Sequence, residues 1–191
     1  ARCAYVALLY GADMEYALGA LLVASSLRRA GALARTVLLH TADVPSGSLE
    51  LLREVYDDVQ LIADPVRVPH DSPLCQRDRD FGHSQFLKLH ILELEFEKVL
   101  YLDSDVLVRR NLDGLFGLQA PAAMERILPM PPHGAKLPNR VGYRGHCVRG
   151  IQGGVMLLAP DAALFASMRQ EVEDPEALRE SSYEPRAGNE Q

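Results

Sequence analysis

The stretch that decides the fold is Lys98-Val99-Leu100-Tyr101-Leu102-Asp103-Ser104-Asp105-Val106-Leu107-Val108. Its first half is a short apolar run, residues 99–102, which is typical of a buried β-strand. The run ends on two carboxylates, Asp103 and Asp105, with one residue between them. Ligands of open α/β sheets bind at the C-terminal ends of the strands. The stretch therefore predicts a strand of such a sheet with a ligand site at its end.

The two aspartates predict a divalent metal site. Side chains at i and i+2 of an extended chain point to the same side, where two carboxylates repel each other unless a cation is near. Ligand sets made of oxygen favour Mg²⁺ or Mn²⁺ over zinc. The alternative is a plain turn, because Asp side chains readily hydrogen-bond to nearby backbone amides. Both interpretations of Asp103 and Asp105 remain open at this point.

The residues around this stretch alternate between predicted strands and predicted helices. This alternation is typical of a parallel sheet flanked by helices. Two proline-rich segments interrupt it, a linker over residues 64–80 and a long loop over residues 124–149; loops of that length are commonly functional. The predicted strands cover residues 5–10, 36–40, 59–63, 99–102 and 155–159, and the predicted helices cover residues 14–30, 49–56, 83–94 and 161–173.

The composition indicates a globular chain of one domain. It has 191 residues, of which 48% are hydrophobic, and a formal net charge of −6. A net acidic chain without a dense Lys/Arg cluster argues against a nucleic-acid partner. No apolar run approaches the ~20 residues of a membrane span, and no signal peptide is visible. The three cysteines are far apart, and no Asn-x-Ser/Thr acceptor occurs. These two observations favour the cytoplasm, with the Golgi lumen as the alternative.

Several segments accompany the aspartate pair in order along nearly the whole chain. They are residues 4–10 with 16–20, Phe86-Leu87-Lys88-Leu89, residues 101–108 with Asn111-Leu112-Asp113-Gly114-Leu115-Phe116, residues 151–156 and Gly188-Asn189-Glu190-Gln191. In this order they resemble the glycogenin-like family 8 retaining glycosyltransferases, which have a GT-A fold. The resemblance implies a Rossmann-like sandwich whose mainly parallel central sheet is flanked by helices. It also implies one nucleotide-sugar-binding domain over residues 1–191.

The same resemblance implies an activity and its partners. The expected reaction moves a hexosyl group from a UDP-sugar to a carbohydrate, protein or lipid-linked acceptor, with Mn²⁺ or Mg²⁺ as cofactor. A homodimer is a possible assembly. The chain departs from the family in three places: Gln152 stands where Asn is usual, Glu190 stands where Asp is common, and the family's later His-x-x-Gly-x-x-Lys segment does not occur before Gln191. The last departure predicts a domain truncated at its C-terminus that lacks a third metal ligand.

The resemblance also assigns roles to individual residues. Asp103 and Asp105 would bind the metal, Lys88 would face the phosphates or the sugar, and Glu190 and Gln191 would join Lys88 as catalytic residues on the sugar face. The donor-binding residues would be Leu9, Tyr10, Gly11, Tyr16, Lys88, Asp103, Ser104, Asp105, Gln152 and Gly153. Each has an ordinary alternative: a solvated lysine, a tyrosine packed on the sheet edge, a turn before a strand, or a frayed terminus.

Two other functions compete with the transferase. A phosphatase of the haloacid-dehalogenase type also places Asp-x-Asp after a strand, although normally after the first strand of its domain. A non-catalytic module that binds UDP-sugars would use the same residues without turnover. Metal-dependent turnover of a UDP-sugar would favour the transferase, and binding without turnover would favour the module.

Overall fold

The computed structural model describes residues 2–69, 82–128 and 148–174. The chain divides into two compact units. One consists of Ala1–Leu61 with Phe96–Pro160, and the other consists of Ile62–Glu95 with Asp161–Gln191. The first unit therefore contains the Asp103–Asp105 pair, and the second contains Lys88.

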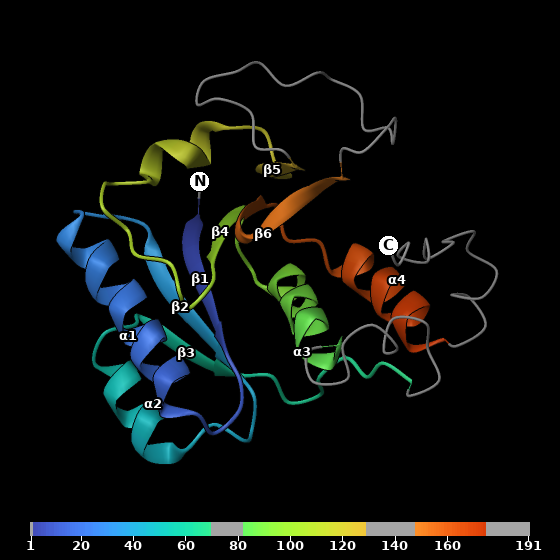
Figure 1. The fold of residues 1–191 in the computed structure, drawn as a ribbon, viewed down its shortest axis with the longest axis horizontal. Coiled ribbons are helices and arrows are strands. Elements are labelled where there is room, and N and C mark those ends of the chain that lie inside the picture. Colours follow the sequence, from blue (N-terminus) through green and yellow to red (C-terminus); the bar gives the residue numbers. More distant parts are fainter. Residues whose placement is uncertain (1, 70–81, 129–147, 175–191) are drawn as a thin grey trace, which may run out of the picture. The chain divides into compact units, whose positions relative to one another are not determined.

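The first unit is built on a six-stranded mixed sheet. Its strands are β1 (Cys3–Leu9), β2 (Arg35–His40), β3 (Asp58–Leu61), β4 (Lys98–Leu102), β5 (Ala122–Leu128) and β6 (Val148–Leu158). Their order in the sheet is β3-β2-β1-β4-β6-β5, as Figure 1 shows. Strands β1 to β4 pair in parallel, whereas β6 runs antiparallel to both β4 and β5. The prediction of a mainly parallel α/β sheet is confirmed.

Helices α1 (Met14–Arg29) and α2 (Ser46–Arg53) belong to the same unit and lie on one side of the parallel strands (Figure 1). Asp13 caps α1, because its carboxylate accepts a hydrogen bond from the Glu15 N–H at 2.8 Å. After α1, Gly31 has φ +72°, a value that suits glycine best. The predicted start of α2 was wrong: the helix begins at Ser46 and its N-cap is Pro45. A 3₁₀ turn, η2 (Asp113–Gly117), follows β4.

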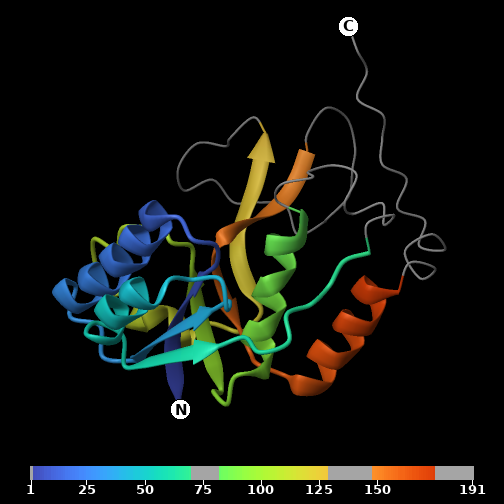
Figure 2. The same cartoon turned by 90° about the horizontal axis from the view of Figure 1, so that it is seen from below.

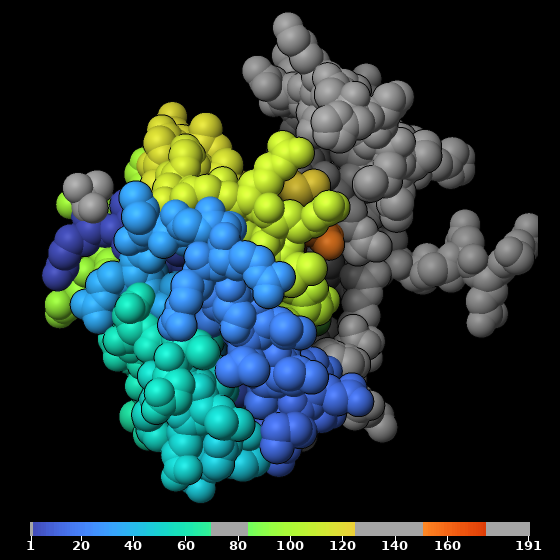
Figure 3. Space-filling model, turned by 90° about the vertical axis from the view of Figure 1, so that its left-hand side faces the viewer, coloured from blue at the N-terminus to red at the C-terminus, as the bar shows by residue number. Residues whose placement is uncertain are grey.

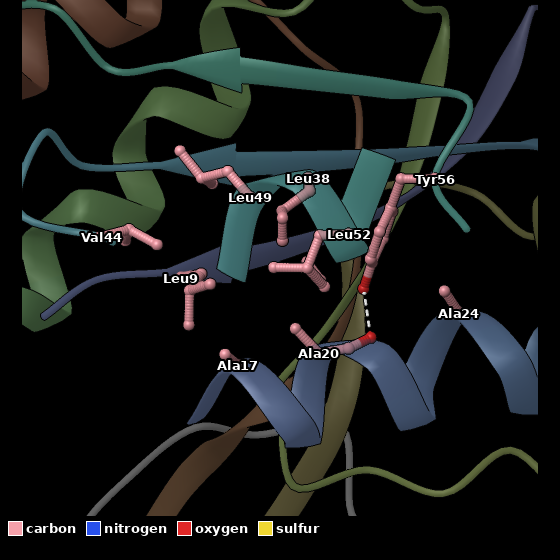
Figure 4. Close-up of a cluster of buried hydrophobic side chains, with 10 residues drawn as sticks. Leu9, Ala17, Ala20, Ala24, Leu38, Val44, Leu49, Leu52 and Tyr56 are labelled. Carbon is pink, nitrogen blue, oxygen red and sulfur yellow. Dashed lines mark hydrogen bonds between the residues drawn. The ribbon is translucent and has the colours of Figure 1, made fainter. Parts of the chain in front are cut away.

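A cluster of buried side chains joins these two helices to the sheet (Figure 4). The α1 side of the cluster consists of alanines, whose small side chains let the helix approach closely. Beyond α2, the Tyr56 hydroxyl donates to the Ala20 carbonyl of α1 at 2.8 Å. Burial raises the pKa of Tyr56, so this hydroxyl remains a donor. The buried members are Ala7, Leu9, Ala17, Ala20, Ala24, Leu38, Val44, Leu49, Leu52 and Tyr56.

The prediction of a long loop was wrong at both of its ends, which belong to strands β5 and β6. Residues 124–128 belong to β5 and residues 148–149 to β6, and the two strands run side by side as an antiparallel pair (Figure 2). A register shift between Ala123 and Met124 interrupts their pairing. Residues 122–128 show no clean alternation of apolar and polar side chains, so the sequence pattern did not reveal this strand. Residues 129–147 of that loop and 70–80 of the predicted linker lie outside the described residues.

The second unit consists of helices and extended chain. Its helices are α3 (Gly82–Phe86), the 3₁₀ helix η1 (Leu87–Glu93) and α4 (Ala162–Glu173). The predicted helix over residues 83–94 is therefore a short α-helix continued by a 3₁₀ helix. Asp161 caps α4, because its carboxylate accepts from the Ala163 and Leu164 N–H groups at 2.9 and 3.0 Å. The buried core of the second unit consists of Val66, Val68, Leu92, Phe165 and Val172.

In the described part of the chain, no helix combines the length and the apolar character that crossing a membrane requires.

Candidate active site

The strand order places the ends of β1 and β4 next to each other. The two strands pair in parallel with Val6 opposite Tyr101, so both reach the same edge of the sheet. The chain leaves β1 toward β2 on one side, while β4 lies on the other side of β1. Ligands of open α/β sheets bind at such a switch point. The structure thus brings together Leu9-Tyr10-Gly11 from the end of β1 and Asp103-Ser104-Asp105 from the end of β4.

Asp103 is held on three sides. Its backbone N–H donates to the Gly154 carbonyl of β6 at 2.9 Å. Its Oδ1 accepts a hydrogen bond from the Tyr101 hydroxyl. Its Oδ2 lies against Gly154, where a Cβ atom would stand 3.1 Å from that oxygen. Glycine at position 154 therefore leaves room for the carboxylate, a role of Gly154 that the sequence pattern did not disclose.

The carboxylate pair fits a hard divalent cation. Asp103 is half-buried and Asp105 is exposed, so the two side chains differ in access to solvent. A side chain at position 154 would crowd Oδ2 of Asp103, and glycine avoids this. Carboxylate oxygens are the ligands that Mg²⁺ and Mn²⁺ prefer. Among the described residues, no group of three or more His, Cys, Asp or Glu side chains is placed to hold a metal ion.

Tyr101 contributes a buried hydroxyl beside this pair. Burial, reinforced by the hydrogen bond and negative charge of Asp103, raises the pKa of Tyr101 far above its ordinary value. The charge of Asp105 and the side chain of Tyr10 act in the same direction. The hydroxyl therefore stays protonated and acts as a donor to Asp103.

The segment after β4 runs along α1. Figure 3 shows it in yellow-green beside the blue helix. A Cβ atom at Gly19 would stand 2.4 Å from the Ser104 carbonyl oxygen, so the Asp-Ser-Asp backbone rests directly on the helix at this glycine. Further along, the Val108 N–H donates to the buried Ser26 Oγ at 3.1 Å. Gly19 lies inside the 16–20 segment but was not predicted to have this role.

An aromatic pair stands at the same edge. The rings of Tyr10 and Tyr16 are 6.1 Å apart between centroids, with their planes tilted by 30°. Tyr16 lies in the first turn of α1 and is 43% exposed. A ring exposed to this extent is available to stack on a flat ligand. The structure therefore gives both predicted tyrosines a shared position beyond β1.

Asp43 was not predicted as a site residue. It follows β2 at this edge, and its carboxylate accepts a hydrogen bond from the Thr41 hydroxyl. That bond, helped by a bond from the Gly11 N–H, outweighs burial and lowers the pKa of Asp43. Gly11 has φ +77°, so this turn favours glycine. A Thr-x-Asp directly after a predicted strand is the sequence signal that could have revealed it.

The remaining predicted residues differ in how they are placed. Gln152 is exposed and Gly153 is half-buried on β6, immediately before the glycine that contacts Asp103. Lys88 is half-buried on η1 of the second unit. Glu190 and Gln191 lie outside the described residues. The roles of Lys88, Glu190 and Gln191 therefore stay predictions.

The Asn111-Leu112-Asp113 sequence, which follows the aspartate pair, makes its hydrogen bonds away from the candidate site. Asp113 Oδ1 accepts from the Tyr5 hydroxyl at 2.7 Å, and Oδ2 accepts from the Leu33 N–H and from Asn111 Nδ2, both at 3.0 Å. Asn111 Nδ2 also donates to the Gly31 carbonyl at 2.6 Å. Tyr5 lies near the start of β1, away from the edge that carries Tyr10. The Asn111-Leu112-Asp113 sequence therefore forms a hydrogen-bond network that holds the fold and lies outside the candidate site.

Known proteins are similar to this chain in sequence and in fold. A model of the family described as glycosyl transferase family 8 matches residues 7–128. An uncharacterised protein of Acanthamoeba polyphaga mimivirus is 32% identical over 88% of this chain and 59% of its own length. Glycogenin of Neurospora crassa is 28% identical over 80% of this chain and 20% of its own length. The chain thus spans less than two thirds of the length of both relatives.

The fold is similar to that of a solved glycosyltransferase. The crystal structure of the galactosyltransferase LgtC, in complex with donor and acceptor sugar analogs, matches with a TM-score of 0.54. The match has 19% identity and covers 90% of this chain and 66% of that chain. This likeness confirms the predicted GT-A type of fold. Because the family model matches more than half of the residues, the chain belongs to glycosyl transferase family 8.

Proposed function

We propose that this chain is the donor-binding part of a metal-dependent retaining glycosyltransferase that moves a hexosyl group from a UDP-sugar to an acceptor. One observation carries the proposal: the Asp103–Asp105 pair and the Tyr10–Tyr16 pair meet at the switch point between β1 and β4. A nucleotide diphosphate offers a flat base and a polyanion, and these two pairs offer a stacking surface and a cation site. Family membership supports the same substrate class.

The end of β1 would hold the nucleoside. The exposed ring of Tyr16 would stack on the base, with Tyr10 beside it. The turn at Gly11, tied to Asp43, would present the backbone of Leu9-Tyr10-Gly11 to the base and the ribose. All of these residues lie within one compact unit of the chain.

The end of β4 would hold the diphosphate through a cation. Asp103 and Asp105 would bind Mn²⁺ or Mg²⁺, and Ser104 would bring its backbone to the same place. When bound, the ion would stabilise the negative charge that develops on the leaving diphosphate. Tyr101 keeps one oxygen of Asp103 hydrogen-bonded, which leaves Oδ2 on the side of Gly154.

The sugar would lie toward β6. Gln152 and Gly153 precede the glycine that contacts Asp103, so their polar groups could bind sugar hydroxyls. Lys88 would supply positive charge to the phosphates or the sugar, and Glu190 and Gln191 would act on the sugar face. The acceptor would be a carbohydrate, a protein or a lipid-linked sugar. These assignments follow the family motifs.

A thermal-shift series tests donor binding. UDP and UDP-sugars should raise the unfolding temperature with Mn²⁺ present, while ADP, or UDP with EDTA, should not. A ligand at 100 times its Kd adds about 2.7 kcal/mol to the free energy of unfolding. If no uridine nucleotide shifts the transition with Mn²⁺, the proposal is wrong.

A turnover assay then separates the competing functions. Metal-dependent release of UDP from a UDP-sugar, with the configuration of the sugar retained, identifies the transferase. Binding of Mn²⁺ and UDP without turnover identifies a non-catalytic module. Hydrolysis of a phosphomonoester, in the absence of UDP binding, identifies the phosphatase.

A further inference from the structure

Tyr101 is a tyrosine where the sheet needs no polar group. Tyr101 is 2% exposed and lies between two buried leucines of β4, Leu100 and Leu102. Phenylalanine would fill the same volume without burying a hydroxyl, whose burial is unfavourable unless it is hydrogen-bonded. The hydroxyl bonds to Oδ1 of Asp103. The strand itself creates this contact, because residues two apart point to the same face.

The hydrogen bond completes a set of restraints on Asp103. The backbone is bound to β6 through the Gly154 carbonyl, Oδ1 accepts from Tyr101, and Oδ2 lies where a Cβ atom at position 154 would stand 3.1 Å away. Asp105, by contrast, is exposed to solvent. The two carboxylates therefore differ: one is held in place and the other is accessible.

We propose that Tyr101 is a positioning residue that holds the Asp103 carboxylate in one orientation, ready to bind the divalent cation of a nucleotide diphosphate. The proposal rests on the function proposed above and adds a residue to it. A carboxylate already oriented loses less freedom when it binds a cation, so the hydrogen bond raises metal affinity. Removing such a supporting hydrogen bond typically lowers metal affinity 10- to 100-fold.

The chain offers a matched control in Tyr5. This tyrosine is 1% exposed, lies on the neighbouring strand β1, and also donates its hydroxyl to an aspartate, Asp113, at 2.7 Å. Asp113 belongs to the hydrogen-bond network of the Asn111-Leu112-Asp113 sequence and not to the site. Tyr5→Phe therefore removes a comparable buried Tyr–Asp hydrogen bond without touching Asp103.

The experiment measures Mn²⁺ affinity by electron paramagnetic resonance, with saturating UDP, for the parent chain, Tyr101→Phe and Tyr5→Phe. Three-bond couplings of Asp103 in the metal-free protein report its side-chain orientation. We expect Tyr101→Phe to weaken Mn²⁺ binding about tenfold or more. The Asp103 couplings should then take the averaged values of a side chain that samples several orientations. Tyr5→Phe should leave both unchanged while lowering the unfolding temperature.

Each other outcome has a distinct meaning. If Tyr101→Phe binds Mn²⁺ like the parent, or if Tyr5→Phe weakens binding equally, the positioning role is wrong while the proposed function stands. If the parent binds no Mn²⁺ with UDP, the proposed function is wrong and the positioning role falls with it. Should Tyr101→Phe fail to fold, Gly154→Ala crowds the same carboxylate from Oδ2; unchanged Mn²⁺ affinity in that variant would also overturn the proposal.

Discussion

The backbone carbonyl of Ser104 occupies the place where a side chain at Gly19 of α1 would begin. A Cβ at position 19 would stand 2.4 Å from that oxygen and 3.2 Å from its carbonyl carbon. Both partners of this contact are backbone, so no side chain can rotate to relieve a clash. The height of the Asp103–Asp105 loop above α1 is therefore set by the absence of a side chain at position 19.

Gly19→Ala should displace this loop and weaken the binding of UDP with Mn²⁺. In a helix, alanine gains up to about 1 kcal/mol over glycine, whereas overpacking costs about 1–3 kcal/mol, so a net loss of stability is expected. Gly47→Ala is the matched control, because Gly47 lies in α2 and has nothing within 4 Å of its added Cβ. That control should be neutral or stabilising. Chemical denaturation and nucleotide titration of both variants give the comparison, and equal behaviour would contradict the contact.

Asp103→Asn and Asp105→Asn should each abolish the Mn²⁺-dependent stabilisation by UDP. Neutralising one of two neighbouring carboxylates relieves their repulsion, so the ligand-free protein should keep its stability within about 0.5 kcal/mol. Glu50→Gln on the exposed side of α2 serves as the charge-matched control. Thermal unfolding with and without Mn²⁺ and UDP measures both effects. A variant that still responds fully to Mn²⁺ would remove that aspartate from the metal site.

Asp43→Ala should weaken nucleotide binding through the Gly11 turn, without altering its dependence on Mn²⁺. The variant removes the acceptor for the Thr41 hydroxyl and for the Gly11 N–H. Two such hydrogen bonds stabilise by about 1 kcal/mol each, so a loss of roughly fivefold in affinity is expected if half of this energy orders the turn. Thr41→Val and the double variant complete a cycle by calorimetry. Additive effects of the two substitutions would mean that Thr41 and Asp43 do not act together.

Asp113 should make stability depend on pH. Burial raises the pKa of Asp113, but the hydrogen bonds from Tyr5, Asn111 and the Leu33 N–H outweigh it, so the folded pKa lies below the ordinary value. Stability from a depressed carboxyl pKa is present above the unfolded pKa, about 3.9, and is lost as pH falls through the folded pKa.

Asp113→Ala should therefore lower the free energy of unfolding by about 2 kcal/mol at pH 7. The difference from the parent should shrink as the pH falls below about 4. Urea unfolding of both proteins from pH 7 to pH 3 measures this difference, and Mn²⁺–UDP affinity at pH 7 serves as the control because Asp113 lies outside the site. A difference that stays constant with pH would show that the charge of Asp113 contributes nothing.

The prediction from sequence succeeded where local chemistry decides the structure. The apolar runs predicted as strands over residues 5–10 and 99–102 form β1 and β4, and the helices predicted over residues 14–30 and 161–173 form α1 and α4. These features depend on neighbours along the chain, so composition and spacing contain them. The roles of Lys88, Glu190 and Gln191, the single domain, the acceptor, the homodimer and the compartment stay predictions.

Contacts between residues distant in sequence could be decided only by the tertiary structure. Gly19 meets Ser104, Gly154 meets Asp103, and Tyr5 meets Asp113, each across elements whose pairing no local pattern records. Strand β5 likewise forms because backbone hydrogen bonds to β6 complete the sheet edge, although its own residues show no strand period. The sequence by itself determined which residues are proposed for the site, through the order of its strands and carboxylates. The packing of α1 and β6 around the end of β4 determined how those residues are held, because steric fit and hydrogen-bond geometry exist only between surfaces already brought together.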